Sequence, residues 1–586
     1  MRSNSQTATS PNSRSSPRSP LQPGFVLLLL LAAVLPYVAS SRFGFVYDDD
    51  VQVLGDPAIR SWHFVPDYFA KPISFFTNTR SVRYYRPVFF LWFRLNYFLW
   101  GPHSFGWHCA NIFLHTVASL LVFGILRRYF ANLRWAFAGA LLFAVHPIHV
   151  ESVAWVSGST DALLALFLFA SLLTWMRATE AAWASARVLS LLLFCVALLT
   201  KETAIVLPAI IFLHGLLKLP SSADSGAEPR FRIATAIRQA LPYLALAIAY
   251  LLLRGFVLKR TPASPAWLSI HESLLTVPKL ILLYAADLIL PWNLSAFYQP
   301  VVTTRPTLLG FWLPLACLVA MCGLACLSVT RAKCQRYVIA VGWFVLPLAP
   351  VLYIRMFQQD DFFHDRYLYI PALAVSMFAA IALEFAERRK WMVPGLPLEI
   401  LPLTLLTLAF AALTVRETKP WRNNLSLYEQ AVRISPANAM ARNNLASEYA
   451  RRGDYSSAAT LLRSVLRDRP NMWLANYNYG YVSYQSRDFR TAAEFLRRAI
   501  AVDPSDPDQY LYLGLTCLKS GRLREAEEQI RQAIARNPRG NGYHLTLALI
   551  QIQSGNYGAA RSELDQELES NPANQPAVGR LQAAIP

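Results

Sequence analysis

Acidic and basic side chains that could do chemistry stand at the ends of long apolar segments in this chain. Asp48 and Asp49 follow the first segment, Glu151 follows a later one, and Lys201 and Arg366 stand beside two more. Ionisable groups are costly next to a bilayer, so groups that are kept there are candidates for functional roles. Carboxylates and cations of this kind suit proton transfer and the stabilisation of charge.

Each of these residues also has a structural interpretation. The run Asp48-Asp49-Asp50 could orient the first span or solvate a loop, and Asp161 could cap the helix that follows it. Lys201 could pair with its neighbour Glu202 at a helix junction, and Arg366 could be an anchor at the membrane surface. From the residues alone, both interpretations stay open.

Two histidines near Glu151 resemble part of a metal site. His146 and His149 are close to Glu151, but Pro147 would break the helix that has to place them on one face. The seven cysteines form no C-x-x-C pair, so they support neither a zinc site nor a disulfide framework. We therefore predict no cofactor, with a divalent metal on the two histidines as the alternative.

Long apolar runs must position these groups. The chain has 586 residues, 54% of them hydrophobic, and apolar runs recur from residue 24 to residue 414. Because about 20 apolar residues span a bilayer, residues 24–415 are predicted to form a multi-pass helical membrane domain. The first run could be a cleaved signal peptide, but the many later runs favour an uncleaved helix. About 11 spans are predicted, at 25–38, 107–126, 134–150, 160–176, 187–200, 203–217, 237–257, 308–328, 337–354, 367–386 and 393–414.

The distribution of positive charge indicates the topology of this domain. The formal charge of +19 could indicate a nucleic-acid partner, but much of it lies in short loops between apolar runs. Eleven crossings place these loops in the cytoplasm, with a disordered N-terminal tail at residues 1–23. The stretches 87–100 and 274–291 then remain interfacial or re-entrant helices. The candidate acids and bases and the C-terminus fall on the non-cytoplasmic side.

A 34-residue period replaces the apolar runs in the last part of the chain. Prolines recur at that spacing at 436, 470, 504, 538 and 572, with small residues at Ala446, Gly480, Gly514 and Ala548. This period predicts tetratricopeptide helix pairs, with repeats at 437–470, 471–504, 505–538 and 539–572 in a domain over 420–586. The predicted fold class is therefore all-α, a polytopic membrane domain followed by an α-solenoid.

The first helices of two repeats carry side chains that could read a peptide backbone. Asn444 and Asn478 occupy equivalent positions, and Tyr477 and Tyr481 flank the second. An asparagine amide can donate to and accept from an extended chain, so we predict an acceptor-peptide groove here. The alternative is that the asparagines only bond neighbouring helices.

Short motifs between residues 45 and 371 occur together in an order that is typical of one protein family. They are Phe45-Val46-Tyr47-Asp48-Asp49, Tyr85-Arg86-Pro87, Phe93-Arg94-Leu95-Asn96, Trp107-His108-x-x-Asn111-x-x-Leu114-His115, His146-Pro147-x-His149-x-Glu151, Lys201-Glu202, Pro291-x-x-Leu294-Ser295-x-x-Tyr298 and Arg366-Tyr367-Leu368-Tyr369-x-Pro371. With repeats that follow Trp421 directly, the chain resembles the transmembrane and tetratricopeptide repeat-containing (TMTC) protein O-mannosyltransferases. These are glycosyltransferases of the GT-C type, which use polyprenyl-phosphate sugars.

The resemblance implies a reaction and a role for each candidate residue. Mannose would pass from a polyprenyl phosphate to a Ser or Thr hydroxyl, with Asp48 or Asp49 as the base and Glu151 orienting the base or the acceptor. The leaving lipid phosphate would be neutralised by fixed cations. These cations are Arg366 and Lys201, with Arg86 and Arg254 behind them.

Two other functions compete with this enzyme. A non-catalytic scaffold would use the repeats to recruit an extracytoplasmic partner and would tolerate loss of the aspartates. A flippase for lipid-linked sugar would place polar residues at mid-membrane, whereas here they gather at the ends of spans. The predicted location is a bacterial plasma membrane, or the endoplasmic reticulum in a eukaryote, with the repeats on the periplasmic or lumenal side.

Overall fold

The computed structural model describes residues 22–72, 84–181, 183–217, 229–258, 267–329, 335–359, 361–389 and 400–586. Most of the predicted N-terminal tail, residues 1–21, lies outside this range. The described residues form helices, and their one β pairing is an isolated bridge between Gln358 and Asp361. The chain divides into two units, one made of 1–296 with 300–426 and one made of 297–299 with 427–586. The all-α prediction is confirmed for the described part of the chain.

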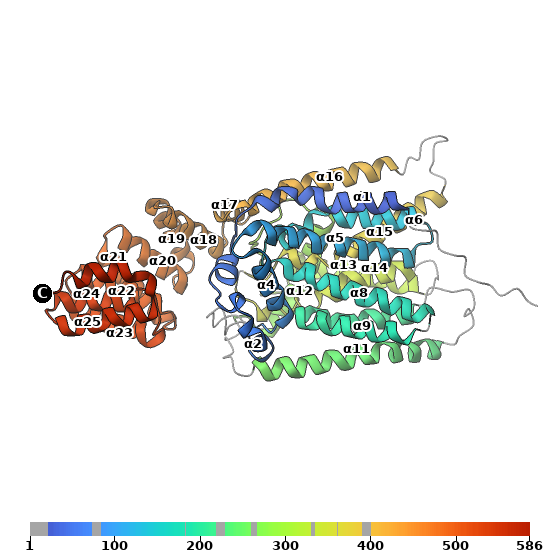
Figure 1. The fold of residues 1–586 in the computed structure, drawn as a ribbon. Coiled ribbons are helices and arrows are strands. Elements are labelled where there is room, and N and C mark those ends of the chain that lie inside the picture. The colour runs from blue at the N-terminus through green and yellow to red at the C-terminus, as the bar shows by residue number, and fades with distance from the viewer. Residues whose placement is uncertain are drawn as a thin grey trace, which may run out of the picture. The chain divides into compact units, whose positions relative to one another are not determined.

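Long apolar helices run side by side through the first unit (Figure 1). In the described part of the chain, five helical segments are long and apolar enough to cross a membrane: Pro23–Arg42, Ser104–Tyr129, Ser159–Glu180, Arg232–Leu258 and Leu401–Arg422. They correspond to α1 (Pro23–Val34) with η1 (Leu35–Arg42), α5 (Ser104–Tyr129), α8 (Ser159–Ala181), α11 (Pro229–Leu258) and α16 (Ile400–Thr418).

A sixth candidate span is broken. The helix α6 (Leu133–Val145) and the segment Pro147–Ala154, which holds η5 (Pro147–His149) and α7 (Val150–Ala154), meet at an angle of 47°. Pro147 lacks the backbone N–H that a continuous helix needs, so the bend falls at this residue. The break turns α7 and its Glu151 away from the line of α6.

The other apolar helices fall short of the length and hydropathy that a membrane span requires. They are α9 (Ala184–Thr200), η6 (Glu202–Val206) with α10 (Leu207–Leu216), η7 (Leu308–Trp312) with α13 (Leu313–Val329), α14 (Gln335–Leu348) and α15 (Ala372–Arg388). The 17 residues of α9 extend only about 26 Å, at about 1.5 Å per residue. The predicted number of about 11 spans is therefore not confirmed by helix length and composition, which support five or six in the described residues.

The two stretches predicted to be interfacial are helices, α4 (Pro87–Trp100) and α12 (Ile270–Ile289). Short helices connect the first span to α4: η2 (Asp50–Leu54), η3 (Ala58–Arg60), η4 (Trp62–Phe64) and α2 (Val65–Ala70). Later connections contain η9 (Ile354–Met356), η10 (Asp365–Leu368) and η11 (Lys419–Arg422). Asp48 and Asp49 lie just before η2, and Arg366 lies in η10.

The second unit is a stack of helix pairs. After α17 (Asn424–Ile434), the pairs are α18 (Ala439–Arg451) with α19 (Tyr455–Asp468), α20 (Trp473–Gln485) with α21 (Phe489–Val502), α22 (Pro507–Lys519) with α23 (Leu523–Arg536), and α24 (Tyr543–Gln553) with α25 (Tyr557–Ser570). The chain then ends in η12 (Pro572–Asn574) and α26 (Gln575–Gln582). Left-handed residues occupy the turn inside each pair: Gly453, Gly521, Gly555 and, in the remaining turn, Arg487 at φ 64°.

Small residues set the distance between paired helices. A Cβ added at Gly480 would lie 2.7 Å from Cγ of Leu496 on the facing helix α21. The helices pack tightly here because apolar interiors leave little free volume. Gly558, by contrast, lies in α25 with nothing within 4 Å of an added Cβ.

We predict opposite effects of alanine at these two helical glycines. Gly480→Ala should lower the local free energy of unfolding of α20 and α21 by about 1–3 kcal/mol because the added methyl overpacks the helix interface. Gly558→Ala should raise the local free energy of unfolding of α25 by about 0.5–1 kcal/mol, since alanine has a higher helix propensity than glycine. Amide hydrogen exchange on the full chain measures both changes, and equal effects at the two sites would contradict the prediction.

Candidate functional site

Asp49 is the buried anchor of the acidic loop, residues 46–50. Its Oδ1 accepts hydrogen bonds from the backbone N (2.8 Å) and the Oγ (2.5 Å) of Ser157, and its Oδ2 accepts from the backbone N of Val46 at 3.0 Å. The side chain is fully buried, and this burial raises the pKa of the carboxyl to about 7, against the opposing effect of the hydrogen bonds. Both oxygens are thus engaged in fixing the loop to the turn before α8.

Asp48 has a different environment although it is the adjacent residue. It is half-buried, and its Oδ2 accepts a long hydrogen bond of 3.4 Å from Nε2 of Gln52. Burial raises the pKa of its carboxyl to about 6, and Asp361 adds to this while Arg366 and His364 oppose it. Of the two aspartates predicted as bases, Asp48 is the one whose oxygens are open to a proton.

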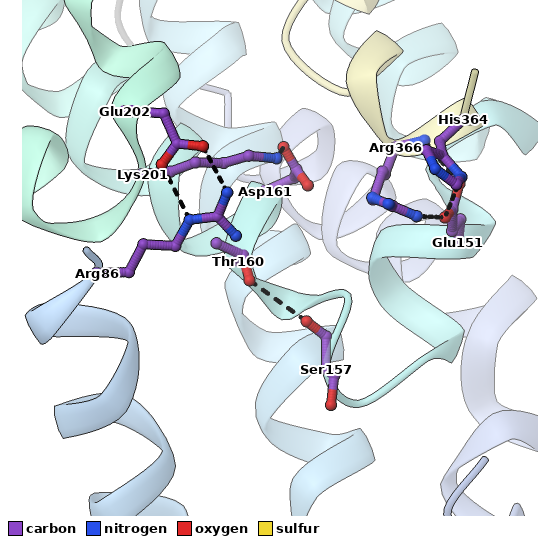
Figure 2. A network of polar contacts seen from close by, with 9 residues as sticks. All are labelled: Arg86, Glu151, Ser157, Thr160, Asp161, Lys201, Glu202, His364 and Arg366. Atoms are coloured by element: carbon purple, nitrogen blue, oxygen red, sulfur yellow. Dashed lines mark hydrogen bonds and ion pairs between the residues drawn. The ribbon is translucent and has the colours of Figure 1, made fainter. Parts of the chain in front are cut away.

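Glu151 and Arg366 form one ion pair from two distant segments (Figure 2). Oε2 of Glu151 accepts from the backbone N of Arg366 at 2.9 Å, and Oε1 pairs with Nη1 of the same residue. Glu151 is buried, so its carboxylate holds both the main chain and the side chain of Arg366. The interpretation of Arg366 as a simple surface anchor is wrong, because its guanidinium is turned inward to this carboxylate.

His364 and Asp361 extend this pair toward the acidic loop. Nε2 of His364 lies 3.2 Å from Oδ1 of Asp361, and its Nδ1 lies 3.8 Å from Oε1 of Glu151. The pKa of Asp361 is lowered by His364 and Arg366 in spite of burial. The sequence reasoning missed Asp361, although it stands in a short polar run just before Arg366.

Two further ion pairs form a second group of charges (Figure 2). Nζ of Lys201 lies 2.6 Å from Oδ1 of Asp161, and both side chains are buried. Arg86 binds Glu202 through two hydrogen bonds, Nε to Oε2 at 3.0 Å and Nη2 to Oε1 at 2.6 Å. The pairing of Lys201 with its neighbour Glu202 is therefore wrong, since each carboxylate holds a cation from elsewhere in the chain.

Electrostatics and aromatic rings connect the two groups. Burial lowers the pKa of Lys201, Asp161 opposes this, and the charges of Arg86 and Arg366 lower the pKa further, so both arginines act on Lys201. The ring of Tyr367 lies under both Lys201 (5.4 Å) and Arg366 (5.2 Å), and the ring of Tyr84 lies 4.1 Å from Arg86. Such cation–π contacts favour the charged forms at a site with little water.

Arg254 approaches this group from α11. Tyr250, one turn earlier on α11, donates a hydrogen bond to the backbone O of Tyr85 at 3.4 Å, beside Arg86. Arg254 is half-buried, and its Nε has no hydrogen-bond partner among the described residues. The structure thus places Arg254 one turn after Tyr250, which bonds to the backbone beside Arg86.

The predicted alternative of a metal on the histidines lacks a ligand set. Nε2 of His146 lies 3.0 Å from the backbone O of Leu288, and His149 packs between the rings of Phe143 and Tyr369, both at 4.4 Å. Glu151 is occupied by Arg366. Across the described residues, no three His, Cys, Asp or Glu side chains are grouped so as to hold a metal ion.

The repeat unit contains a short asparagine ladder. Asn478 donates through Nδ2 to Oδ1 of Asn443 at 3.0 Å, and Asn443 donates to Oδ1 of Asn444 at 3.3 Å. These bonds leave the Nδ2 of Asn444 and the Oδ1 of Asn478 for other partners. Asn443 was missed because it lies one position from the periodic residue.

A tyrosine cluster lies on the same repeats as the ladder. The rings of Tyr477 and Tyr481 lie 6.1 Å and 4.9 Å from that of Tyr512, and Tyr484 adds a fourth ring at 5.9 Å. Tyr477 and Tyr481 are half-buried. The predicted peptide-binding residues are thus partly engaged with one another and partly exposed.

Comparison with known proteins confirms the resemblance that the motifs predicted. Residues 85–224 match the family described as dolichyl-phosphate-mannose-protein mannosyltransferase, and residues 443–508 and 511–576 match tetratricopeptide repeats. The first segment contains Arg86, Glu151, Asp161 and Lys201. The ion pairs of the site therefore lie largely within the matched region.

Similar proteins include several named protein O-mannosyl-transferases. The chain is 26% identical to TMTC1 of Homo sapiens over 78% of this chain and 57% of that protein, and 25% identical to F38B6.6 of Caenorhabditis elegans over 72% and 59%. TMTC1 of Mus musculus is 34% identical over 36% of this chain and 24% of its own length. The chain therefore spans little more than half the length of the first two of these relatives. Among solved structures, MamA from Desulfovibrio magneticus RS-1 is 23% identical, with a TM-score of 0.24, over 25% of this chain and 84% of its own.

Removing the carboxylate from the buried pair should be costly. Asp161→Asn leaves the cation of Lys201 without compensation beside two arginines, so we expect a loss of about 3 kcal/mol in the free energy of unfolding. The control is Asp67→Asn, since Asp67 also lies in the first turn of its helix and pairs with Lys71, but with side chains about one-third exposed. For Asp67→Asn we expect a loss of less than about 1 kcal/mol in the free energy of unfolding. Thermal unfolding of the full chain in detergent measures both, and equal losses would contradict the expected difference.

Proposed function

We propose that the chain is a membrane glycosyltransferase that moves mannose from a polyprenyl-phosphate donor to Ser or Thr hydroxyls of a polypeptide. The observation that carries the proposal is Asp48, a half-buried carboxylate whose pKa is raised by burial and lowered by the charge of Arg366. The ring of Trp155 contacts both Arg366 and Tyr47, the residue before Asp48. A base and a phosphate-binding cation in one site are what transfer from a phosphate to a hydroxyl requires. The similarity to protein O-mannosyl-transferases supports the same chemistry.

In the proposed reaction, Asp48 accepts the proton of the acceptor hydroxyl as its oxygen attacks the anomeric carbon of the sugar. The bond from that carbon to the phosphate oxygen breaks, and its electron pair leaves with the lipid phosphate. The phosphate charge is received by Arg366, with Lys201 and Arg86 nearby. Glu151 acts as a positioning residue, because it holds the main chain and side chain of Arg366 together.

The ion pairs leave donors free for a phosphate. Arg366 uses Nη1 for Glu151, and Arg86 uses Nε and Nη2 for Glu202. A guanidinium carries five N–H donors, so both side chains keep N–H groups that can point at phosphate oxygens. The carboxylates keep the arginines oriented before the donor arrives, which lowers the reorganisation needed in the reaction.

We assign the repeats the role of acceptor binding on the same, non-cytoplasmic side of the membrane as the site. Nδ2 of Asn444 and Oδ1 of Asn478, which make no hydrogen bond within the described part of the chain, suit the two hydrogen-bonding groups of an extended main chain. The rings of Tyr477 and Tyr481 offer flat apolar contacts beside them. We propose a bacterial plasma membrane as the location, or the endoplasmic reticulum membrane if the protein is eukaryotic.

The transfer reaction and its pH dependence test the proposal. Purified full-length protein receives labelled polyprenyl-phosphate mannose and a Ser/Thr-rich polypeptide, and kcat/KM should fall below about pH 6 as Asp48 becomes protonated. Asp48→Asn should lower kcat by about 100- to 10,000-fold, whereas the control Asp67→Asn should leave it unchanged. Undiminished transfer by Asp48→Asn would rule out this base. No transfer by the wild type from any lipid-phosphate sugar would instead favour a scaffold.

Peptide binding by the repeats gives a separate kinetic expectation. Asn444→Ala with Asn478→Ala should raise KM for a long polypeptide acceptor about 10-fold and leave kcat unchanged, since the removed groups bind away from the reacting atoms. A Ser-containing tripeptide, which offers little extended main chain for the asparagines to bind, serves as the control acceptor and should show no change. A fall in kcat with both acceptors would contradict a role limited to binding.

A further inference from the structure

Two side chains from the segment just before the repeats support the acidic loop, Asn424 directly and Trp421 through Trp155. Trp421 belongs to η11, and Asn424 is the first residue of α17. Both are buried, at 5% and 8% exposure. They come from the far end of the chain, 377 residues from Tyr47 in the case of Asn424. The sequence reasoning assigned neither of them a role in the site.

Asn424 holds the loop on both sides of Asp48. Its Oδ1 accepts a hydrogen bond from the backbone N of Tyr47 at 2.7 Å, and its Nδ2 donates to Oδ2 of Asp50 at 3.2 Å. One side chain therefore contacts the residue before Asp48 and the second residue after it. Its carbonyl and its amide each have a defined partner in the loop.

The loop needs such support because of its backbone conformation. Tyr47 has φ 58°, a left-handed conformation that a residue with a Cβ seldom adopts. Conformations of this kind persist where surrounding contacts determine them. The hydrogen bond to Asn424 is made by the N–H of this same residue. The direction of Asp48, the next residue, depends on that turn.

Trp421 supports the other side of the site through stacked rings. Its ring stacks on Trp155, with centroids 5.9 Å apart and planes 21° apart. The ring of Trp155 also contacts Tyr47 at 5.3 Å and lies 5.6 Å from the guanidinium carbon of Arg366. Trp155 is thus a common surface for the acidic loop, the arginine and the segment before the repeats.

We propose that Asn424 is a positioning residue for transfer: it fixes the loop so that Asp48 faces the space beside Arg366, and Trp421 completes the support through Trp155. This inference rests on the proposed function for its catalytic meaning. The clamp itself, the two hydrogen bonds of Asn424 to Tyr47 and Asp50, can be measured without activity. The site is then complete only when the segment 421–424 is in place.

The chain offers a matched control one residue away. Asn423 accepts a hydrogen bond from the backbone N of Ser426 at 3.0 Å, which caps the first turn of α17. Within the described part of the chain, its side chain makes no hydrogen bond to the acidic loop. Asn423→Ala therefore removes a helix cap, and Asn424→Ala removes the clamp. The comparison separates loss of helix stability from loss of loop position.

Kinetics and hydrogen exchange on full-length protein test the proposal. Asn424→Ala should lower kcat by about 100-fold with KM for the lipid donor nearly unchanged, because misplacing a reacting group affects mainly the chemical step. The acidic limb of the pH profile should move to lower pH as Asp48 becomes more hydrated. The amide of Tyr47 should exchange faster in this variant, while Asn423→Ala should match the wild type in all three measurements.

A reciprocal variant provides rescue. Asn424→Asp alone places two carboxylates together and should be as impaired as Asn424→Ala. Asn424→Asp with Asp50→Asn reverses donor and acceptor in the same hydrogen bond, keeps the acceptor for Tyr47, and should regain most of the activity.

Three outcomes would overturn the inference: unchanged exchange at Tyr47 in Asn424→Ala, equal kinetic effects of the two alanine variants, or no rescue by the reciprocal pair. Absence of transfer by the wild type would count against the proposed function alone, since the exchange measurement still decides whether Asn424 holds the loop.

Discussion

The cost of burying charge governs the arrangement of the first unit. Lys201, Arg86 and Arg366 are held where water is scarce, and each is bound by a carboxylate from another segment. A buried cation without such a partner loses its proton or destabilises the fold, so the pairs must form together with the packing of the helices that carry them. The short elements α7, η6 and η10 place charged residues where these pairs can form, and the long helices set the distances between the short elements.

The same constraint separates two adjacent aspartates into different roles. Asp49 enters the interior and needs the three hydrogen bonds from Ser157 and Val46 to be accommodated there. Asp48 stays at the edge, where the nearby acid Asp361 and the cation of Arg366 act on its pKa in opposite directions. Burial and partners, and not residue type, thus decide which carboxylate can exchange a proton at neutral pH.

The repeats follow a simpler physical rule. Their contacts join helices that are close in sequence, so a small residue such as Gly480 meets a side chain only a few turns away, Leu496 on the next helix. A solenoid of this kind is stabilised pair by pair, with each pair covering the apolar face of its neighbour. That regularity leaves polar side chains such as Asn444 and Asn478 in equivalent places, available for an extended ligand.

The amino-acid sequence by itself determined the all-α class and the helix pairs of the repeats, because apolar length and a 34-residue period are local properties of the chain. It named most of the ionisable residues of the candidate site as well, with Asp361 as an exception. It also indicated about eleven spans, whereas the described helices include only five or six of sufficient length, since apolar runs do not reveal where short breaks such as Pro147 divide a helix. Only the tertiary structure decided which charges pair, that Asp48 rather than Asp49 is open, and that Asn424 contacts Tyr47. Those contacts join residues up to 377 positions apart, and no periodicity specifies partners at that distance because they depend on how the intervening helices pack.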